Sequence, residues 1–141
     1  MFRLLDELTY PVELRWLQAH GLTGLTPWHF ITEDGARGLR AEFRREATAP
    51  HHQIRDFLPF ASRQDCDDVA GFVVVDGVAT SQVIEVHLTW RGSVEAAGFP
   101  SLVVYDSLWA WLKSAIDHTR DWCNEEELSS LTECADDRQP N

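Results

Sequence analysis

Three short runs of β-branched and aromatic residues in the middle of the chain constrain its fold more than any other feature. They span Phe57–Ala61, Val69–Val75 and Gln82–Trp90, and turn residues such as Asp76-Gly77 separate them. Runs of this kind are typical of strands joined by tight turns. The middle run is apolar on both faces and belongs in the centre of a sheet, whereas the third alternates as a half-buried strand does. The sequence therefore predicts an antiparallel sheet over residues 57–90.

Helical patterns lie on both sides of these runs. Pro11–His20 predicts a first helix, which begins at a proline and is followed by a glycine. Ala36–Ala47 indicates a surface helix with one narrow apolar stripe. After a further short strand at Ser101–Tyr105, apolar residues recur at helical spacing over Leu108–Trp122 and predict a closing helix.

Two segments between the first helix and the sheet have patterns of their own. Thr26-Pro27-Trp28 predicts the start of a short helical turn, and Glu33-Asp34-Gly35 predicts a loop. Helices first, meandering strands next and a closing helix define an α+β single domain, with an antiparallel sheet packed by N-terminal and C-terminal helices. This domain should cover residues 1–123, and the acidic residues 124–141 should form a frayed tail.

The composition supports a globular domain and argues against several other classes of protein. The chain has 141 residues, is 44% hydrophobic and contains six Trp, which is enough to build one sizeable core. No apolar run approaches the roughly 20 residues of a membrane-spanning helix, and the acidic start lacks the apolar stretch of an export signal. The three cysteines are widely spaced and match neither a disulfide framework nor a zinc site. We therefore expect a reduced, cytoplasmic protein.

The negative charge is confined to the second half of the chain. Residues 1–64 contain eight acidic and eight basic residues, whereas residues 65–141 contain fifteen acidic and four basic residues. The second half thus carries the whole net charge of -11. A field of this sign repels nucleic acid and anionic membranes and attracts basic proteins. Acidity also keeps a protein in solution, so the charge alone does not establish a partner.

The densest acidic cluster lies between the first two predicted strands. Asp65, Asp67 and Asp68 fall within four residues, and Arg63 is close enough to neutralise one of them. Aspartates suit turns because their side chains bond to the turn backbone, yet crowded like charges favour a cation, an arginine or a charged partner. The glycine and distal glutamate of an EF-hand loop are missing. We predict a solvated turn that contacts a partner and binds no metal.

The remaining polar residues form no catalytic pattern. His51-His52 lies in a predicted loop without a third metal ligand, and His87 is expected to be a buried, hydrogen-bonded histidine of a strand. Acidic neighbours should raise the pKa of Cys66, which argues against a nucleophile. No nucleophile elbow, phosphate loop or dinucleotide fingerprint is present. The sequence predicts no enzyme and no cofactor, with a metal-dependent enzyme built on the acidic turn and a histidine as the alternative.

The tryptophans of the closing helix supply a second candidate contact. Trp109 and Trp111 lie two residues apart, so they cannot both face the core from one helix. We predict that Trp109 points outward and anchors a partner, because exposed tryptophans are frequent hot spots of interfaces.

Four segments, taken in their order along the chain, resemble the SUKH superfamily, which includes yeast cell-wall synthesis regulators and many bacterial immunity proteins. They are Thr26–Ile31, Leu58–Phe72, Ile84–His87 and Tyr105–Leu112. The part from Pro59 to Phe72 is the most specific of them.

The resemblance implies an α+β fold, no catalysis and a surface that binds another protein. Immunity proteins of this kind bind a cognate toxin, often a nuclease, whose phosphate-binding surface is basic. An acidic second half suits such a partner. A cytoplasmic regulatory scaffold, the role suggested by the yeast relatives, is a further alternative.

Overall fold

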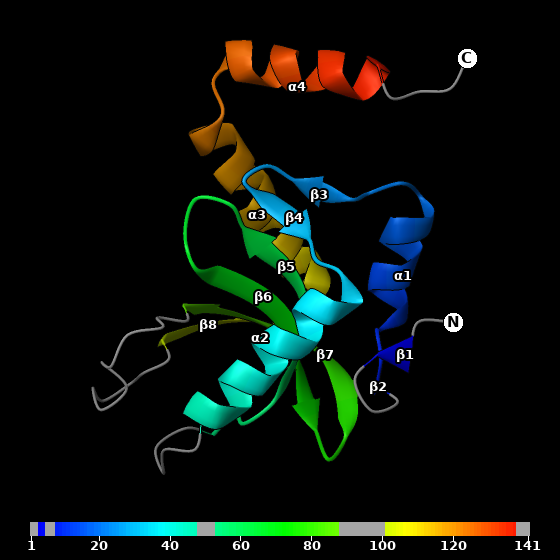
Figure 1. Cartoon of the computed structure of the whole chain (residues 1–141), viewed down its shortest axis with the longest axis vertical. Coiled ribbons are helices and arrows are strands. Elements are labelled where there is room, and N and C mark those ends of the chain that lie inside the picture. Colours follow the sequence, from blue (N-terminus) through cyan, green and yellow to red (C-terminus); the bar gives the residue numbers. More distant parts are fainter. Residues whose placement is uncertain (1–2, 5–7, 48–52, 88–100, 138–141) are drawn as a thin grey trace.

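The three predicted strands are neighbours in one antiparallel sheet. They form β5 (Phe57–Arg63), β6 (Asp68–Val75) and β7 (Val78–His87). The computed structural model describes residues 3–4, 8–47, 53–87 and 101–137 (Figure 1), so residues 88–90 of the third predicted run lie outside it. The turn between β6 and β7 is Asp76-Gly77, with φ of 52° and 77°, the conformation that a tight hairpin requires.

Three further strands complete a six-stranded sheet in the order β3-β4-β5-β6-β7-β8. They are β3 (Gly24–Leu25), β4 (Trp28–Phe30) and β8 (Ser101–Tyr105). All neighbouring strands pair antiparallel. Strand β6 lies between β5 and β7 and is buried on both faces, as its continuous apolar sequence predicts. A separate two-stranded pair, β1 (Arg3–Leu4) and β2 (Leu8–Thr9), precedes the sheet.

Helices cover both faces of the sheet. The described helices are α1 (Val12–Ala19), α2 (Glu33–Glu46), α3 (Leu108–Trp122) and α4 (Glu125–Asp137), of which α4 lies across one end of the molecule. Figure 1 shows α2 in front of the sheet and α3 behind it. On the α3 side, the core joins α1 and α3 to Leu58, Phe60 and Phe72; on the α2 side, Phe43 packs with residues such as Phe57 and Val73.

The α+β single domain and the closing helix are therefore confirmed. Helix α3 begins and ends where the pattern predicts, and the Ser107 hydroxyl caps it by accepting a hydrogen bond from the amide of Ala110 at 3.2 Å. The first helix is also confirmed. Within the described ranges, no helix is both long enough and apolar enough to cross a membrane.

Three local expectations differ from the structure. The segment predicted to begin a helical turn leads into strand β4, because Trp28 pairs with Arg63 of β5 and buries its side chain in the core. Glu33-Asp34-Gly35, predicted as a loop, forms the first turn of α2, which Thr32 caps at 3.2 Å. Beyond residue 124, where a frayed tail was expected, the chain forms α4, whose first turn is capped by the Asn124 side chain at 2.8 Å.

Candidate functional site

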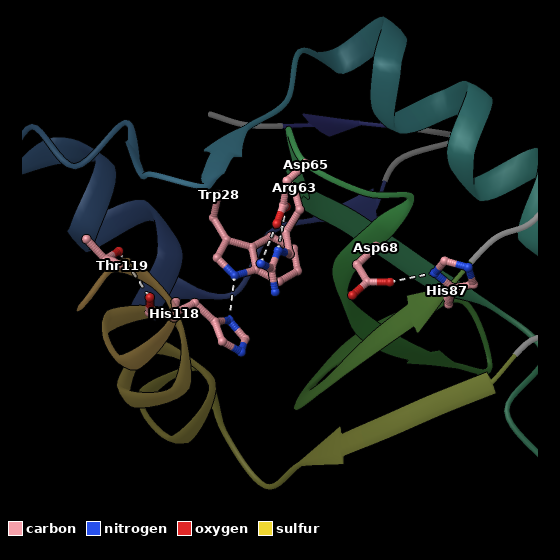
Figure 2. Close-up of polar contacts among 8 residues, drawn as sticks. Trp28, Arg63, Asp65, Asp68, His87, His118 and Thr119 are labelled. Atoms are coloured by element: carbon pink, nitrogen blue, oxygen red, sulfur yellow. Dashed lines mark hydrogen bonds and ion pairs between the residues drawn. The ribbon is translucent and has the colours of Figure 1, made fainter. Parts of the chain in front are cut away.

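The acidic residues lie where β5 turns into β6, as the sequence predicts. Strand β5 ends at Arg63, residues 64–67 form a bend, and Asp68 is the first residue of β6. Figure 2 shows Asp65 and Asp68 at the two ends of this connection, each pointing toward a different basic side chain. The three acids therefore share a loop but have different surroundings.

Asp65 forms a two-pronged ion pair with Arg63. The Arg63 Nε and Nη2 donate to Asp65 Oδ1 and Oδ2 at 2.8 and 2.7 Å. The guanidinium carbon also lies 5.8 Å from the ring centroid of Trp28 (Figure 2), within the range of a cation–π contact. The hydrogen bond from Arg63 lowers the pKa of Asp65, so the carboxylate stays ionised while its charge is offset. The expectation that Arg63 neutralises one acid is confirmed.

Asp68 pairs with His87 from the neighbouring strand. The two residues are register partners of β6 and β7, and Asp68 Oδ1 lies 2.8 Å from His87 Nδ1. The prediction of a buried His87 was wrong, since 45% of its side chain is exposed. Along this face of β7 exposure rises from Val83 through Glu85 to His87, because the core ends before the strand does.

The remaining loop residues face outward. Asp67 and Cys66 are exposed. The pKa of the Cys66 thiol is raised, as predicted, although partial burial is the largest cause and the charges of Asp68 and Asp65 add to it. Across the part of the chain that the structure describes, no three His, Cys, Asp or Glu side chains are arranged to hold a metal ion. His51 and His52 lie outside the described residues.

A buried polar cluster between the sheet and α3 was missed by the sequence analysis. Glu85 lines a cavity of about 90 Å³ together with residues that include Asp68 and His87. Its Oε1 atom and the indole Nε1 of Trp111 are both buried and have no hydrogen-bond partner among the described residues. Burial raises the pKa of Glu85, against the opposing influence of His118. The only signal in the sequence was an acid between the apolar residues Ile84 and Val86 of an alternating strand run.

The adjacent His118 takes part in a defined hydrogen bond. The indole Nε1 of Trp28 donates to His118 Nδ1 at 3.0 Å (Figure 2). Because an indole N–H only donates, Nδ1 of His118 is the acceptor of this hydrogen bond. The contact joins β4 to α3 at the end of the sheet that carries the acidic loop.

A groove joins the acidic loop to α4. It has a volume of about 270 Å³ and is lined by Thr26, Gln64, Trp122, Glu127 and Ser130. Gln64 precedes Asp65 directly, and Glu127 ends the acidic first turn of α4. The Trp122 side chain is 37% exposed between them. This arrangement was not predicted, because residues 124–141 were expected to form a tail, although Asn124 followed by three glutamates is a recognisable helix start.

Trp109 lies away from this groove. It is exposed, as predicted, whereas Trp111 is buried at 1% exposure. Trp109 packs edge-on against Trp16 of α1, with ring centroids 6.4 Å apart, and the two line a shallow apolar patch with Val12. Trp122 lies thirteen positions after Trp109 along α3, which corresponds to about 20 Å of helix. The structure therefore does not bring Trp109 together with the acidic loop.

Comparisons with protein-family models, with curated proteins and with solved structures gave no match. The resemblance to the SUKH superfamily stays a prediction.

Proposed function

We propose that this chain is a non-catalytic module that binds a basic protein partner through the surface around the β5–β6 loop. One observation carries the proposal: Gln64, which precedes Asp65 in the loop, and Glu127 of the acidic first turn of α4 line the same groove, in which Trp122 is partly exposed. Following the SUKH resemblance, the partner that we propose is a toxin with a nuclease-like, basic surface, and the role is that of an immunity protein.

The charges of this surface favour a basic partner. Glu125, Glu126 and Glu127 are exposed in the first turn of α4, and Asp67 is exposed in the loop. Acidic groups gathered on one surface steer a basic protein toward it and speed association. A half-exposed tryptophan within such a surface is the type of side chain that contributes most to binding energy.

The ion pairs favour binding over metal-dependent catalysis. Two of the three loop acids already face a cationic or imidazole group, Asp65 with Arg63 and Asp68 with His87. The contact between Asp68 and His87 is a single pair near the surface, whereas the enzyme alternative calls for several ligands that converge on one point. The regulatory scaffold uses the same surface and differs only in its partner.

A charge reversal at the tip of the loop tests the proposal. The partner is first captured from the source cell with the unmodified chain and then measured in binding kinetics. Asp67→Lys should lower the association rate several-fold at low salt, and the difference should shrink as salt rises and the screening length falls to about 8 Å. Asp67 suits this test because its reversal breaks neither of the two ion pairs.

Asp34→Lys is the matched control, since it makes the same charge change at an exposed position of α2. It should leave association nearly unchanged. A captured partner that is acidic, or one whose association rate ignores both salt and Asp67→Lys, would overturn the proposal.

A further inference from the structure

A second groove, larger and more apolar, runs along the outer side of α3 where α3 meets α4. It encloses about 420 Å³ and is lined by Leu25, Ile116, Thr119, Arg120, Cys123, Glu125 and Leu128. The three α3 residues among them, Ile116, Thr119 and Arg120, recur at helical spacing and so form one face of that helix. Ile116 and Leu128 are 52% and 42% exposed. These apolar side chains therefore lie open to solvent.

Acidic side chains outnumber basic ones in the segments that form this groove. Residues 117–127 contain five acidic residues and a single basic one, Arg120. Arg120 is itself paired, with Nη1 at 3.4 Å from Asp117 Oδ1 and Nε at 3.3 Å from Asp121 Oδ1. Its positive charge is thus offset by these two carboxylates, and Glu125, which lines the groove, leaves the charge beside the apolar floor negative.

The groove adjoins the acidic site described above. Leu25 lines the apolar groove and Thr26, the next residue, lines the groove beside the β5–β6 loop. In the same way Leu128 follows Glu127 in α4. The two grooves therefore have neighbouring residues at the β3–β4 turn and at the start of α4, the helix that crosses one end of the molecule in Figure 1.

We propose that this groove binds a basic amphipathic helix of the protein partner. The inference rests on the proposed function and adds the chemistry of the segment that is recognised. An apolar stripe at i, i+3, i+4 and i+7 would pack on Ile116, Leu25 and Leu128. Lysine or arginine side chains on its flanks would meet Glu125 and the two aspartates that pair with Arg120. A second copy of this chain is disfavoured because it would place acid against acid, and nucleic acid or an anionic membrane is disfavoured for the same reason.

The test uses fluorophore-labelled synthetic peptides of about 18 residues, long enough to form a helix when bound. The first peptide arranges leucines on one face and lysines on the other. The second has the same composition with the leucines scattered around the helix, and the third replaces each lysine by glutamate. Fluorescence anisotropy with the whole chain should show binding of the first peptide, weaker binding of the second and none of the third.

Variants of the chain then locate the binding surface. Ile116→Asp and Leu128→Asp should each raise the Kd of the first peptide about tenfold. Val78→Asp is the matched control, because Val78 is a comparably exposed aliphatic residue, at 64%, in the β6–β7 hairpin. It should leave the Kd unchanged. Circular dichroism would establish that all three variants are folded.

Three outcomes would overturn the inference: no binding of the first peptide, equal binding of the first two peptides, or a Kd that Ile116→Asp and Leu128→Asp leave unchanged. The captured partner separates this failure from failure of the proposed function. If its association still depends on salt and on Asp67, the chain binds a basic protein without using the apolar groove. If its association depends on neither, both proposals fail.

Discussion

Glu85 brings a carboxyl group into the space between β7 and α3. Its side chain points to the face that Val83 and Phe72 build, close to the fully buried Trp111. In these surroundings the Glu85 carboxylate loses its hydration. Its Oε1 atom has no hydrogen-bond partner among the described residues that would compensate for this loss. The penalty applies to the charged form, which is why the pKa of Glu85 is raised above its ordinary value of 4.5.

We expect Glu85→Gln to stabilise the fold at neutral pH. An acid whose folded pKa is raised destabilises the fold when it is ionised, and this cost disappears as the pH falls through the folded pKa toward the unfolded value near 4.5. The gain of Glu85→Gln over the unmodified chain should therefore be largest at pH 7 and shrink toward pH 4. Urea unfolding across this range measures it, with the exposed Glu126→Gln as control. A variant less stable than the unmodified chain at pH 7 would mean that the favourable interactions of the carboxylate with His118, Tyr105 and Trp111 outweigh the cost of burial.

At the scale of the element, β6 depends on close contact with β5. Gly71 is the register partner of Pro59, next to the irregularity in β5 between Pro59 and Ala61. A Cβ atom at Gly71 would lie 2.5 Å from Phe57 Cδ2 and 2.8 Å from the Leu58 carbonyl oxygen. Glycine is required here because the backbone of a neighbouring strand occupies the space of a side chain.

Gly71→Ala should destabilise the protein by about 1–3 kcal/mol, the usual cost of overpacking a core. Gly38→Ala is the matched control, since a Cβ at that position of α2 meets nothing within 4 Å. It should stabilise the protein by roughly 0.5–1 kcal/mol, because alanine loses less backbone freedom than glycine in a helix. Denaturant unfolding of both variants measures the two effects. Similar free energies of unfolding for the two variants would refute the crowding at Gly71.

At the scale of the whole molecule, the separation of charge is the dominant electrostatic feature. The whole net charge of -11 belongs to residues 65–141, and much of it lies on surface elements such as α4. The ion pair of Arg40 and Asp56, at 2.7 Å, links α2 to the approach of β5 and is mostly buried, with 10% and 19% of the two side chains exposed. Salt therefore weakens the repulsion among exposed acidic side chains more than it weakens the attraction between Arg40 and Asp56.

We expect the free energy of unfolding to rise when NaCl increases from about 10 to 150 mM, because the screening length falls from about 30 to 8 Å and weakens repulsion among the acids. Urea unfolding at the two concentrations measures the change. Replacing Glu125, Glu126 and Glu127 together by glutamine should reduce the response to salt. A free energy that falls with salt would instead show that ion pairs outweigh the repulsion.

Local sequence patterns predicted much of the secondary structure of this protein. The limits of α3, the strand character of β5 and β6 and the Asp-Gly turn follow from periodicity and turn chemistry, which act over a few residues. The pairing of Arg63 with Asp65 was also within reach, because only two positions separate them. The concentration of negative charge in residues 65–141 follows from the sequence alone.

Contacts between distant segments were decided by the tertiary structure alone. Trp28 is part of a strand because it pairs with Arg63, which lies 35 positions later in the chain. Strand register placed His87 beside Asp68, and packing placed Trp109 against Trp16 of α1. The groove beside the acidic loop combines Gln64 with Trp122 and Glu127, and no spacing in the sequence indicates that proximity. Periodicity determines which face of an element is apolar, whereas packing of the whole chain determines which elements meet.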